Sequence, residues 1–452
     1  MKQPSNETQS AIEEPVRKVD VAIVGGGMVG LTLACALGGS DLNVVVIDPL
    51  AINADERIKQ VEQAAQKGFD PRVSALSLAS EQILTAVGAW PVMQQQRLCT
   101  YTDMRVWDGQ GTAEIEFCAT EQHLTHLGHL VENRVTLAGL HCAFERHDNL
   151  QLLAGVTLKT LSEPLYSEPM YKETDSLSLA NSSRQLQLSD GSRINATLVV
   201  AADGARSPTR TQAGLPLSEW DYQHHAIVTT VTTERPHQAT AWQRFTDDGP
   251  LALLPLPGDG HQLSIVWSTS PDHARQLMKL DDPSFCNALE HAFEGRLGQV
   301  LAADPRFVFP LVQRHAKRYV ASSLALVGDA AHSIHPLAGQ GVNIGLLDAA
   351  TLAEELLETH RLQLPIGDIN RLRRYQRRRQ PENMAMLGMM AGFRHLYGDV
   401  PPLLHWLRNA GMKQVAKTGV IKRKLVRHAL GLEGDLPALA WAPLAENIVT
   451  ES

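Results

Sequence analysis

The chain has 452 residues, of which 44% are hydrophobic and 20% charged, a composition typical of a folded protein with room for two or three domains. No apolar run reaches the roughly 20 residues that a membrane-spanning helix needs, and residues 1–16 are polar and acidic, unlike a signal peptide. We therefore expect a cytoplasmic protein. The five cysteines are scattered without a CxxC pair, so we predict no disulfide framework, no metal site and no dithiol redox centre.

The first chemical motif follows an apolar segment, 19–24, that has the pattern of a buried strand. It runs into Gly25-Gly26-Gly27-Met28-Val29-Gly30, then a helical stretch over 31–37 and a second strand over 43–47 that ends in Asp48. This order of elements, a strand, a GxGxxG turn, a helix and a second strand that ends in an acid, predicts a dinucleotide site. The acid lies about twenty residues after the glycines, as in known sites of this kind. Gly25 would permit the tight turn, Gly27 the approach of a pyrophosphate and Gly30 the packing of helix on strand, while Asp48 would bind ribose hydroxyls.

The next 140 residues carry weaker signals. Residues 51–69 are charged and rich in Gln and Ala, and we interpret them as an excursion over the surface. Arg72, just after it, is a candidate contact for cofactor phosphates, and an ordinary surface arginine is the alternative. Strand patterns follow over 104–117, 152–161 and 185–188, and the repeated Ser-Glu-Pro segment 162–171 is interpreted as a surface loop without chemistry.

A second strand that ends in an acid lies in the middle of the chain. The apolar run 197–202 leads into Asp203-Gly204. Residues 215–310 then change to successive strands with one helix near 283–293. Strands without alternating helices predict an antiparallel sheet and therefore a second, substrate-covering domain.

A third strand-end acid follows the apolar run 324–327, in the segment Gly328-Asp329. After it come a loop with proline and glycines and a helical pattern that begins near Gly341. Glycines here would let the backbone approach a planar ligand, and the helix N-terminus would favour negative charge, which suits the N1–C2=O edge of a reduced flavin. A glycine-rich turn that merely needs positive φ is the alternative.

Charge is unevenly placed along the chain. The net charge is −8, but residues 361–430 contain fifteen Lys or Arg and three acids, a local +12 that leaves −20 on the rest. A solvated helix face is the ordinary explanation of this charge. Contact with a membrane or a membrane-bound complex is the sharper hypothesis. Binding to nucleic acid is disfavoured because no recognition motif accompanies the charge. The basic residues form two clusters: Arg371, Arg373, Arg374, Arg377, Arg378 and Arg379, and then Lys413, Lys417, Lys422, Arg423, Lys424 and Arg427.

Together, GGGMVG, VAADGARS and LALVGDAAHSIHPLAGQGVNIGLLDA, in this order, resemble the flavin aromatic hydroxylases of the p-hydroxybenzoate hydroxylase fold. The segments LGHLVEN, DYQHHA, GPLALLPL and HSIHPLAGQG resemble, more narrowly, the FAD-dependent hydroxylases of ubiquinone biosynthesis, among them the bacterial 2-polyprenylphenol and 3-demethoxyubiquinol hydroxylases. The resemblance covers nearly all of residues 19–432. It implies an α/β fold with a Rossmann-type FAD-binding domain, an antiparallel-sheet substrate domain and a C-terminal helical region.

The resemblance also implies roles for particular residues. Gly25, Gly27, Gly30 and Asp48 would hold the ADP half of FAD, Asp203 and Gly204 would lie near the pyrophosphate and ribose, and Gly328-Asp329 would reach the ribityl chain. Pro336 would lie beside the reactive face of the flavin. The pyrimidine edge would be lined by Gly339, Gln340, Gly341, Val342 and Asn343, and the catalytic candidates are Pro336, His335 and Gly341.

Two positions are left open by the resemblance. Asn133 stands where many flavin hydroxylases have an arginine that contacts the cofactor, and neighbouring Arg134 is a possible substitute. His332 and His335 are candidates for proton handling, but a hydrogen bond that orders the loop is the favoured role for each.

The implied reaction is hydroxylation of a polyprenylated phenol through a flavin C4a-hydroperoxide, with O2 and with NAD(P)H or another reductant as electron donor. A soluble aromatic substrate and a non-catalytic flavoprotein subunit are the alternatives. The implied place is the cytoplasm or the inner face of the membrane, and a homo-oligomer is compatible with the family. The expected division is FAD domain 17–100, 128–214 and 311–350, substrate domain 101–127 and 215–310, and C-terminal helical basic module 351–440.

Overall fold

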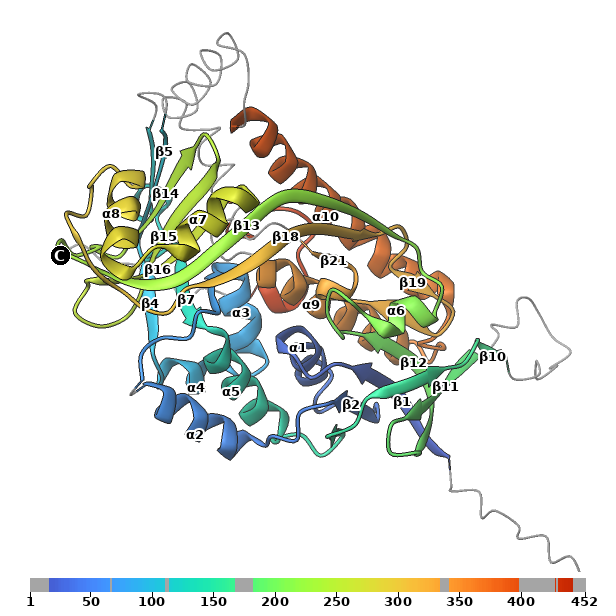
Figure 1. Cartoon of the computed structure of the whole chain (residues 1–452). Helices are drawn as coiled ribbons and strands as arrows, with labels where there is room; N and C mark the ends of the chain where they lie inside the picture. The colour runs from blue at the N-terminus through green and yellow to red at the C-terminus, as the bar shows by residue number, and fades with distance from the viewer. Residues whose placement is uncertain are drawn as a thin grey trace, which may run out of the picture.

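The computed structural model describes residues 16–65, 67–109, 114–166, 182–333, 341–397, 427 and 430–441, with residues 389–397 described as helix only. In these residues the chain forms two nine-stranded sheets and one three-stranded sheet (Figure 1). No helix among them is long and apolar enough to cross a membrane.

The first sheet contains the predicted dinucleotide-binding strands. Its main path runs β10-β11-β12-β1-β2-β8, with β20 beside β12. The strands β12, β1, β2, β8 and β20 pair in parallel, and Val24 of β1 lies opposite both Ile47 and Ala201. The carboxyl ends of these strands therefore lie along one edge of the sheet. The strands are β1 Arg17–Val24, β2 Val44–Asp48, β8 Leu150–Ala154, β9 Leu158–Leu161, β10 Leu165–Tyr166, β11 Ser182–Leu188, β12 Arg193–Ala201, β19 Val320–Ala321 and β20 Leu324–Leu326.

Helices α1 and α9 pack together over the strand ends of this sheet (Figure 1). Helix α1, Met28–Ala36, is almost entirely apolar because it is buried between the sheet, α9 and α5. The residues interpreted as a surface excursion contain helix α2, whose Ala54 and Val61 are buried. The helices of this half are α2 Ala54–Ala65, α3 Leu78–Ala86, α4 Trp90–Gln94, α5 Asn133–Phe144, α6 Pro208–Gln212, α9 Gly341–Arg361 and α10 Ile369–Tyr397.

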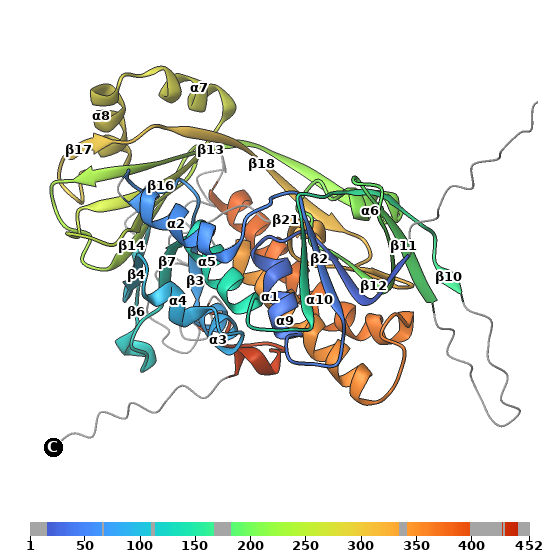
Figure 2. The same ribbon diagram turned by 90° about the horizontal axis from the view of Figure 1, so that it is seen from below.

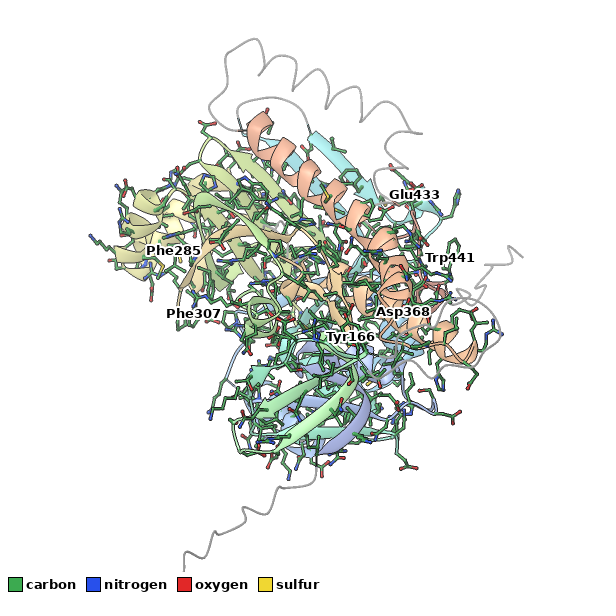
Figure 3. The ribbon with its side chains drawn as sticks, turned by 90° about the vertical axis from the view of Figure 1, so that its right-hand side faces the viewer. Tyr166, Phe285, Phe307, Asp368, Glu433 and Trp441 are labelled. Carbon is green, nitrogen blue, oxygen red and sulfur yellow. The ribbon has the colours of Figure 1, made fainter. Side chains whose placement is uncertain are left out.

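The second sheet confirms the predicted run of strands. Its order is β21-β18-β13-β16-β15-β14-β5-β6, with β17 beside β13, and all pairs are antiparallel except β5 with β14. Helices α7 and α8 cover its outer side (Figure 2), and Phe285 of α8, labelled in Figure 3, is fully buried there. The elements are β5 Asp103–Asp108, β6 Glu114–Cys118, β13 Leu217–Thr233, β14 Thr240–Thr246, β15 Gly249–Pro255, β16 Gln262–Thr269, α7 Pro271–Lys279, α8 Asp282–Ala292, β17 Val300–Ala303, β18 Phe307–Ala316 and β21 His332–Ser333.

The two halves are joined by long strands and by a small third sheet. Strands β13 and β18 run from the second sheet toward the first half (Figure 1), and the proposed domain boundary at residue 310 falls inside β18. The third sheet has the order β3-β7-β4, with β3 Val73–Ser77, β4 Leu98–Tyr101 and β7 Gly128–Glu132. The domain division itself remains a proposal.

Helix α10 contains the first basic cluster, and part of that cluster is paired with acids inside the protein. Arg374 lies 2.9 Å from Glu355, and Arg378 contacts Glu354, Glu355 and Asp435. Arg379 is buried against Asp348. Acids of α9 and of the C-terminal segment near Glu433 (Figure 3) therefore pair with these three arginines. Contact of the basic clusters with a membrane stays a proposal.

Candidate flavin site at the strand ends

Glycines set the backbone of the first strand end. Gly25 has φ +114°, and a Cβ there would lie 2.3 Å from the carbonyl oxygen of Ala202 on the neighbouring strand end. A Cβ on Gly30 would lie 2.0 Å from the carbonyl oxygen of Gly25. Both residues must be glycine for the α1 turn to pack this closely.

Gly27 has a different environment. It is exposed, and among the described residues no atom lies within 4 Å of the position of its Cβ. Gly27 is also the N-cap residue of α1. Because glycine has no side chain, it offers the first backbone amides of that helix no hydrogen-bond acceptor. Open space in front of free amides at a helix N-terminus fits a pyrophosphate.

Asp48 at the end of β2 is held by the backbone. Its Oδ2 accepts a hydrogen bond from the amide of Gly26 at 2.7 Å, and its Oδ1 accepts one from Leu50 at 2.8 Å. These bonds fix the carboxylate beside the glycine turn. Each oxygen retains a second lone pair, which a ribose hydroxyl could use.

Asp203 at the end of β12 has one unused oxygen. Its Oδ2 accepts from the Thr209 amide at 3.0 Å, whereas Oδ1 is buried and has no hydrogen-bond partner among the described residues. Gly204 beside it adopts φ +82° and leaves the space around its Cβ position open. A buried carboxylate oxygen without a donor is unfavourable, so this atom fits a hydroxyl-bearing ligand.

Asp329 lies in a short 3-10 turn, η2 Gly328–Ala330, that follows β20. Its side chain is exposed, yet enough protein surrounds it for desolvation to raise its pKa, an effect that the charges of His332 and Arg314 only partly oppose. The turn needs glycine: Gly328 has φ +56°, and its Cβ position lies 3.0 Å from Val29 of α1. A carboxylate that is reachable but poorly solvated is suited to binding a polyol hydroxyl.

The N-terminus of α9 is anchored by Asn343, a role that sequence reasoning missed. Its Nδ2 donates to the carbonyl of Ala75 at 2.8 Å, and its Oδ1 accepts from the Ser77 amide at 3.0 Å and from Ser80 Oγ at 2.7 Å. The Asn343 side chain is thus committed to the β3–α3 turn, which leaves only its backbone amide for a flavin. Val342 and Gly341, half-buried, precede it.

Gly341 does not adopt positive φ, so the alternative explanation of a forced left-handed turn does not apply at that residue. Pro336, His335, Gly339 and Gln340 lie outside the described residues. Their predicted contacts remain proposals.

The open question at Asn133 and Arg134 has a structural answer for the arginine. Arg134 is paired with Glu132, a buried carboxylate that also binds Arg97 at 3.0 Å. Arg134 is therefore committed to neutralising Glu132. The side-chain Oδ1 of Asn133 accepts a hydrogen bond from Ser74 Oγ at 2.6 Å, and the backbone amide of Asn133 donates to the backbone carbonyl of Arg72. The Arg72 residue is exposed.

Behind the strand ends lies a buried polar network around Asp348 of α9. Asp348 is fully buried and accepts hydrogen bonds from the Gly328 amide, from Arg379 Nε at 2.9 Å and from Asn383 Nδ2 at 3.1 Å. His332 Nε2 lies 2.5 Å from its Oδ2. Burial alone would raise the pKa of Asp348, but the charges and hydrogen bonds of His332 and Arg379 outweigh it and lower the pKa to about 2.

This network places His332 in the loop-ordering role favoured for it, because its ring is tied to α9. A second buried group, Arg210 of α6, connects two of the acid-bearing turns. Its guanidinium donates to the carbonyls of Ala330 and Ala205 at 2.8 and 3.1 Å. Asp348 carries no local sequence signal of its role, because its partners are 16 or more residues away, and the bond from Arg210 to Ala330 spans 120 residues.

This chain resembles known proteins in sequence and in fold. Residues 172–389 match the family described as FAD binding domain. The chain is 37% identical to ubiquinone hydroxylase UbiL of Rhodospirillum rubrum, with 91% of this chain and 89% of that protein covered. It is 36% identical to 3-demethoxyubiquinol 3-hydroxylase of Escherichia coli, with 91% and 98% covered.

The chain belongs to the FAD-dependent hydroxylases of ubiquinone biosynthesis. This confirms the resemblance noted in the sequence, and it makes the protein a flavoprotein monooxygenase whose cofactor is FAD. Among solved structures, p-nitrophenol 4-monooxygenase PnpA from Pseudomonas putida superposes with a TM-score of 0.69 at 19% identity over 93% of this chain and all of that one. At this identity it supports the expected p-hydroxybenzoate hydroxylase-like fold alone.

The described residues fit FAD. The unpaired Oδ1 of Asp203, the open space at Gly27 and the exposed but poorly solvated Asp329 lie at neighbouring strand ends of one parallel sheet. A dinucleotide bound along these strand ends would contact the backbone amides at the start of α1 with its pyrophosphate. The aspartates would accept hydrogen bonds from its sugar hydroxyls. The assignment of each contact is a proposal.

Proposed function

We propose that this hydroxylase acts on the aromatic ring of a polyprenylated phenol, a lipid precursor of ubiquinone. The observation that carries the proposal is the likeness to the Rhodospirillum rubrum and Escherichia coli proteins, whose names state ubiquinone and demethoxyubiquinol chemistry, over nine-tenths of the chain. The polar strand ends described above support the FAD half of the proposal.

In this proposal the chain's residues hold and orient the cofactor. Amides at Gly27 and the start of α1 face the pyrophosphate, Asp48 and Asp203 accept from ribose hydroxyls, and Asp329 accepts from the ribityl chain. The chemistry supplied by bound FAD is reduction by NAD(P)H or another donor and transfer of one atom of O2 to an aromatic carbon.

The amides of Gly341, Val342 and Asn343 would face the pyrimidine edge, where negative charge develops on reduction. Asn343 holds them in place by three hydrogen bonds to the β3–α3 turn, so their orientation is set before the reaction. His332 would keep the segment after Asp329 in place through Asp348. Pro336 and His335 are proposed to lie at the reactive face.

The substrate assignment is tested by the compound that accumulates in cells lacking the protein, which should be a polyprenylated phenol one ring hydroxyl short of its product. With purified FAD-loaded protein, NAD(P)H and O2, oxygen consumption should rise on adding the prenylated phenol and stay low with the same ring lacking its tail. Equal turnover of both compounds would favour a soluble aromatic substrate. Absence of turnover with either, under each reductant, would favour a non-catalytic flavoprotein subunit.

Contact with a membrane surface is a further part of the proposal, because a polyprenyl tail places the substrate in the bilayer. The second basic cluster, Lys413 to Arg427, lies outside the described residues except for Arg427, which pairs with Glu433 at 3.6 Å. Each basic residue near an anionic leaflet contributes about 1 kcal/mol. Lys422, Arg423 and Lys424 all changed to Glu should therefore weaken binding to anionic liposomes while FAD content stays intact.

The matched control is the same charge reversal on α10 at Arg371, Arg373 and Arg377, which have no ion pair to an acid among the described residues. If only this second triple variant loses liposome binding, the membrane-facing surface is α10 and not the second cluster. If neither loses binding, the proposed electrostatic contact is wrong.

A further inference from the structure

Three potential metal ligands meet at a place that no metal-binding motif marks. Glu81 comes from α3, His126 from the segment before β7, and His129 from β7 itself. Their ligand atoms all lie within 4.8 Å of one another, although Glu81 is 45 residues from His126 in the sequence. The fold brings them together because β7 pairs with β3, the strand that leads directly into α3.

The spacing of the atoms is close to that of a metal site. His126 Nε2 lies 2.8 Å and His129 Nδ1 lies 3.3 Å from the same oxygen, Oε2 of Glu81. In a tetrahedral zinc site, with ligands about 2.0–2.1 Å from the ion, neighbouring ligand atoms lie about 3.3 Å apart. Small side-chain shifts would therefore place an ion between the three groups.

His129 provides an independent indication. It is 6% exposed, and its Nδ1, 3.3 Å from Glu81 Oε2, meets no hydrogen-bond geometry among the described residues. A buried ring nitrogen without a hydrogen bond is unfavourable. Because this nitrogen faces a carboxylate and another imidazole, it is available to bind a metal ion together with them. The ring is fixed by edge contacts with Trp90 at 4.9 Å and with His126 at 4.6 Å between ring centroids.

The other two ligands have the right supporting contacts. The second ring nitrogen of His126, Nδ1, lies 2.8 Å from Thr125 Oγ1, an outer hydrogen bond of the kind that orients metal-binding imidazoles. The side chains of Glu81 and His126 are 21% and 17% exposed, which gives an ion and a water ligand a way in.

We propose that Glu81, His126 and His129 bind a divalent transition metal of the zinc class, with water in the fourth position. Two imidazoles and one carboxylate favour such an ion over Mg²⁺ or Ca²⁺, which prefer oxygen ligands. The ion would clamp α3 to β7. Because Ser77 and Ser80 at the start of α3 also bind Asn343, the site supports the helix whose amides are proposed to face the flavin.

The test uses the full chain, free of any affinity tag, loaded with FAD and treated with chelator. Titration with Zn²⁺ should show one tight site per chain, and Co²⁺ should give the visible absorption of a tetrahedral site. Glu81→Gln and His126→Gln should each weaken Zn²⁺ binding more than about 100-fold, since loss of an outer contact alone weakens metal affinity about 10–100-fold. Zn²⁺ should raise the melting temperature of the wild type and leave that of both variants unchanged.

The matched control is His273→Gln. His273 Nδ1 lies 3.1 Å from Asp248 Oδ2 and so repeats the His–carboxylate pair without a second imidazole. This variant should bind Zn²⁺ like the wild type. FAD content shows that each variant is folded, which separates loss of the site from loss of the protein.

Absence of tight Zn²⁺ and Co²⁺ binding in the folded wild type would overturn the proposal and leave the three groups as an internal hydrogen-bond cluster. Equal affinity in the wild type and the two ligand variants would place the ion elsewhere. Neither result bears on the hydroxylase activity, which is measured separately.

Discussion

The carboxylates at the strand ends and the carboxylate buried behind them differ in how their oxygens are hydrogen-bonded. Asp348 in α9 has donors from a backbone amide, an arginine, an asparagine and a histidine, and it is fully buried. Asp203 and Asp329, at the strand ends in front of it, leave an oxygen unpaired or remain exposed.

The number of internal hydrogen bonds distinguishes the carboxylate that stabilises the fold, Asp348, from the carboxylates that are available to bind a ligand, Asp203 and Asp329. A buried acid with several internal donors has little capacity for a cofactor hydroxyl, and its loss leaves charges unpaired inside the protein. An acid with an unused oxygen is poorly satisfied until a ligand donates to it. Substitutions in the two groups should therefore affect different measurements.

The largest effect is expected for Asp348→Ala. Removal of one partner from a buried ion pair typically costs about 3–5 kcal/mol, because Arg379 and His332 lose their counter-charge. Urea unfolding should show this loss, whereas Glu358→Ala, an exposed i,i+3 partner of Arg361, should leave the unfolding midpoint unchanged. Near-wild-type stability of Asp348→Ala would contradict the structural role.

Asp329→Ala and Asp203→Ala should lose FAD and keep the fold. A hydrogen bond to a charged group contributes about 1.5–3 kcal/mol, so each change should weaken FAD binding roughly tenfold or more. Because the folded pKa of Asp329 is raised, the folded apoprotein disfavours its ionised form, and its removal should not lower apoprotein stability at neutral pH. Fluorescence titration of the apoprotein with FAD measures the affinity, and full flavin retention would remove the basis of the site assignment.

The pH dependence of the free energy of unfolding should report on the Asp348 network independently of the flavin site. The folded pKa is lowered from 3.8 to about 2, so the ionised form stabilises the fold. That contribution is complete above pH about 4 and disappears as the pH falls to about 2, with a total of about 2 kcal/mol. The wild type should lose this stability over that range, and Asp348→Asn should lack the step. An identical acid profile in both proteins would show that Asp348 does not titrate as described.

The smallest effect is expected for Gly341→Ala. Among the described residues nothing lies within 4 Å of the new Cβ, and φ is not positive, so the fold should tolerate it. If the Cβ separates the helix terminus from the flavin, loss of part of the dipole interaction, about 0.3–1 kcal/mol, should lower the flavin reduction potential and slow turnover. Unchanged potential and unchanged turnover would exclude this part of the site.

Several features of the protein could be predicted from the sequence because their signals are local. The three strand ends that carry Asp48, Asp203 and Asp329 each show an apolar run that ends in an acid, with a glycine beside it at Asp203 and Asp329, and parallel pairing then aligns them. The succession of strands over 215–310 likewise predicted the second sheet. Its one parallel pair, β5 with β14, joins segments far apart in the chain and had no local sign.

Other features depended on contacts between distant segments, which periodicity does not encode. Asn343 meets α3 across 263 residues, and Arg379 meets Asp348 across 31, so neither role is visible in the neighbouring sequence. Arg374, Arg378 and Arg379 of α10 pair with acids of α9 and of the C-terminal segment, which no local pattern indicated. The Glu81–His126–His129 group follows the same rule, because only the pairing of β7 with β3 brings its members within bonding distance.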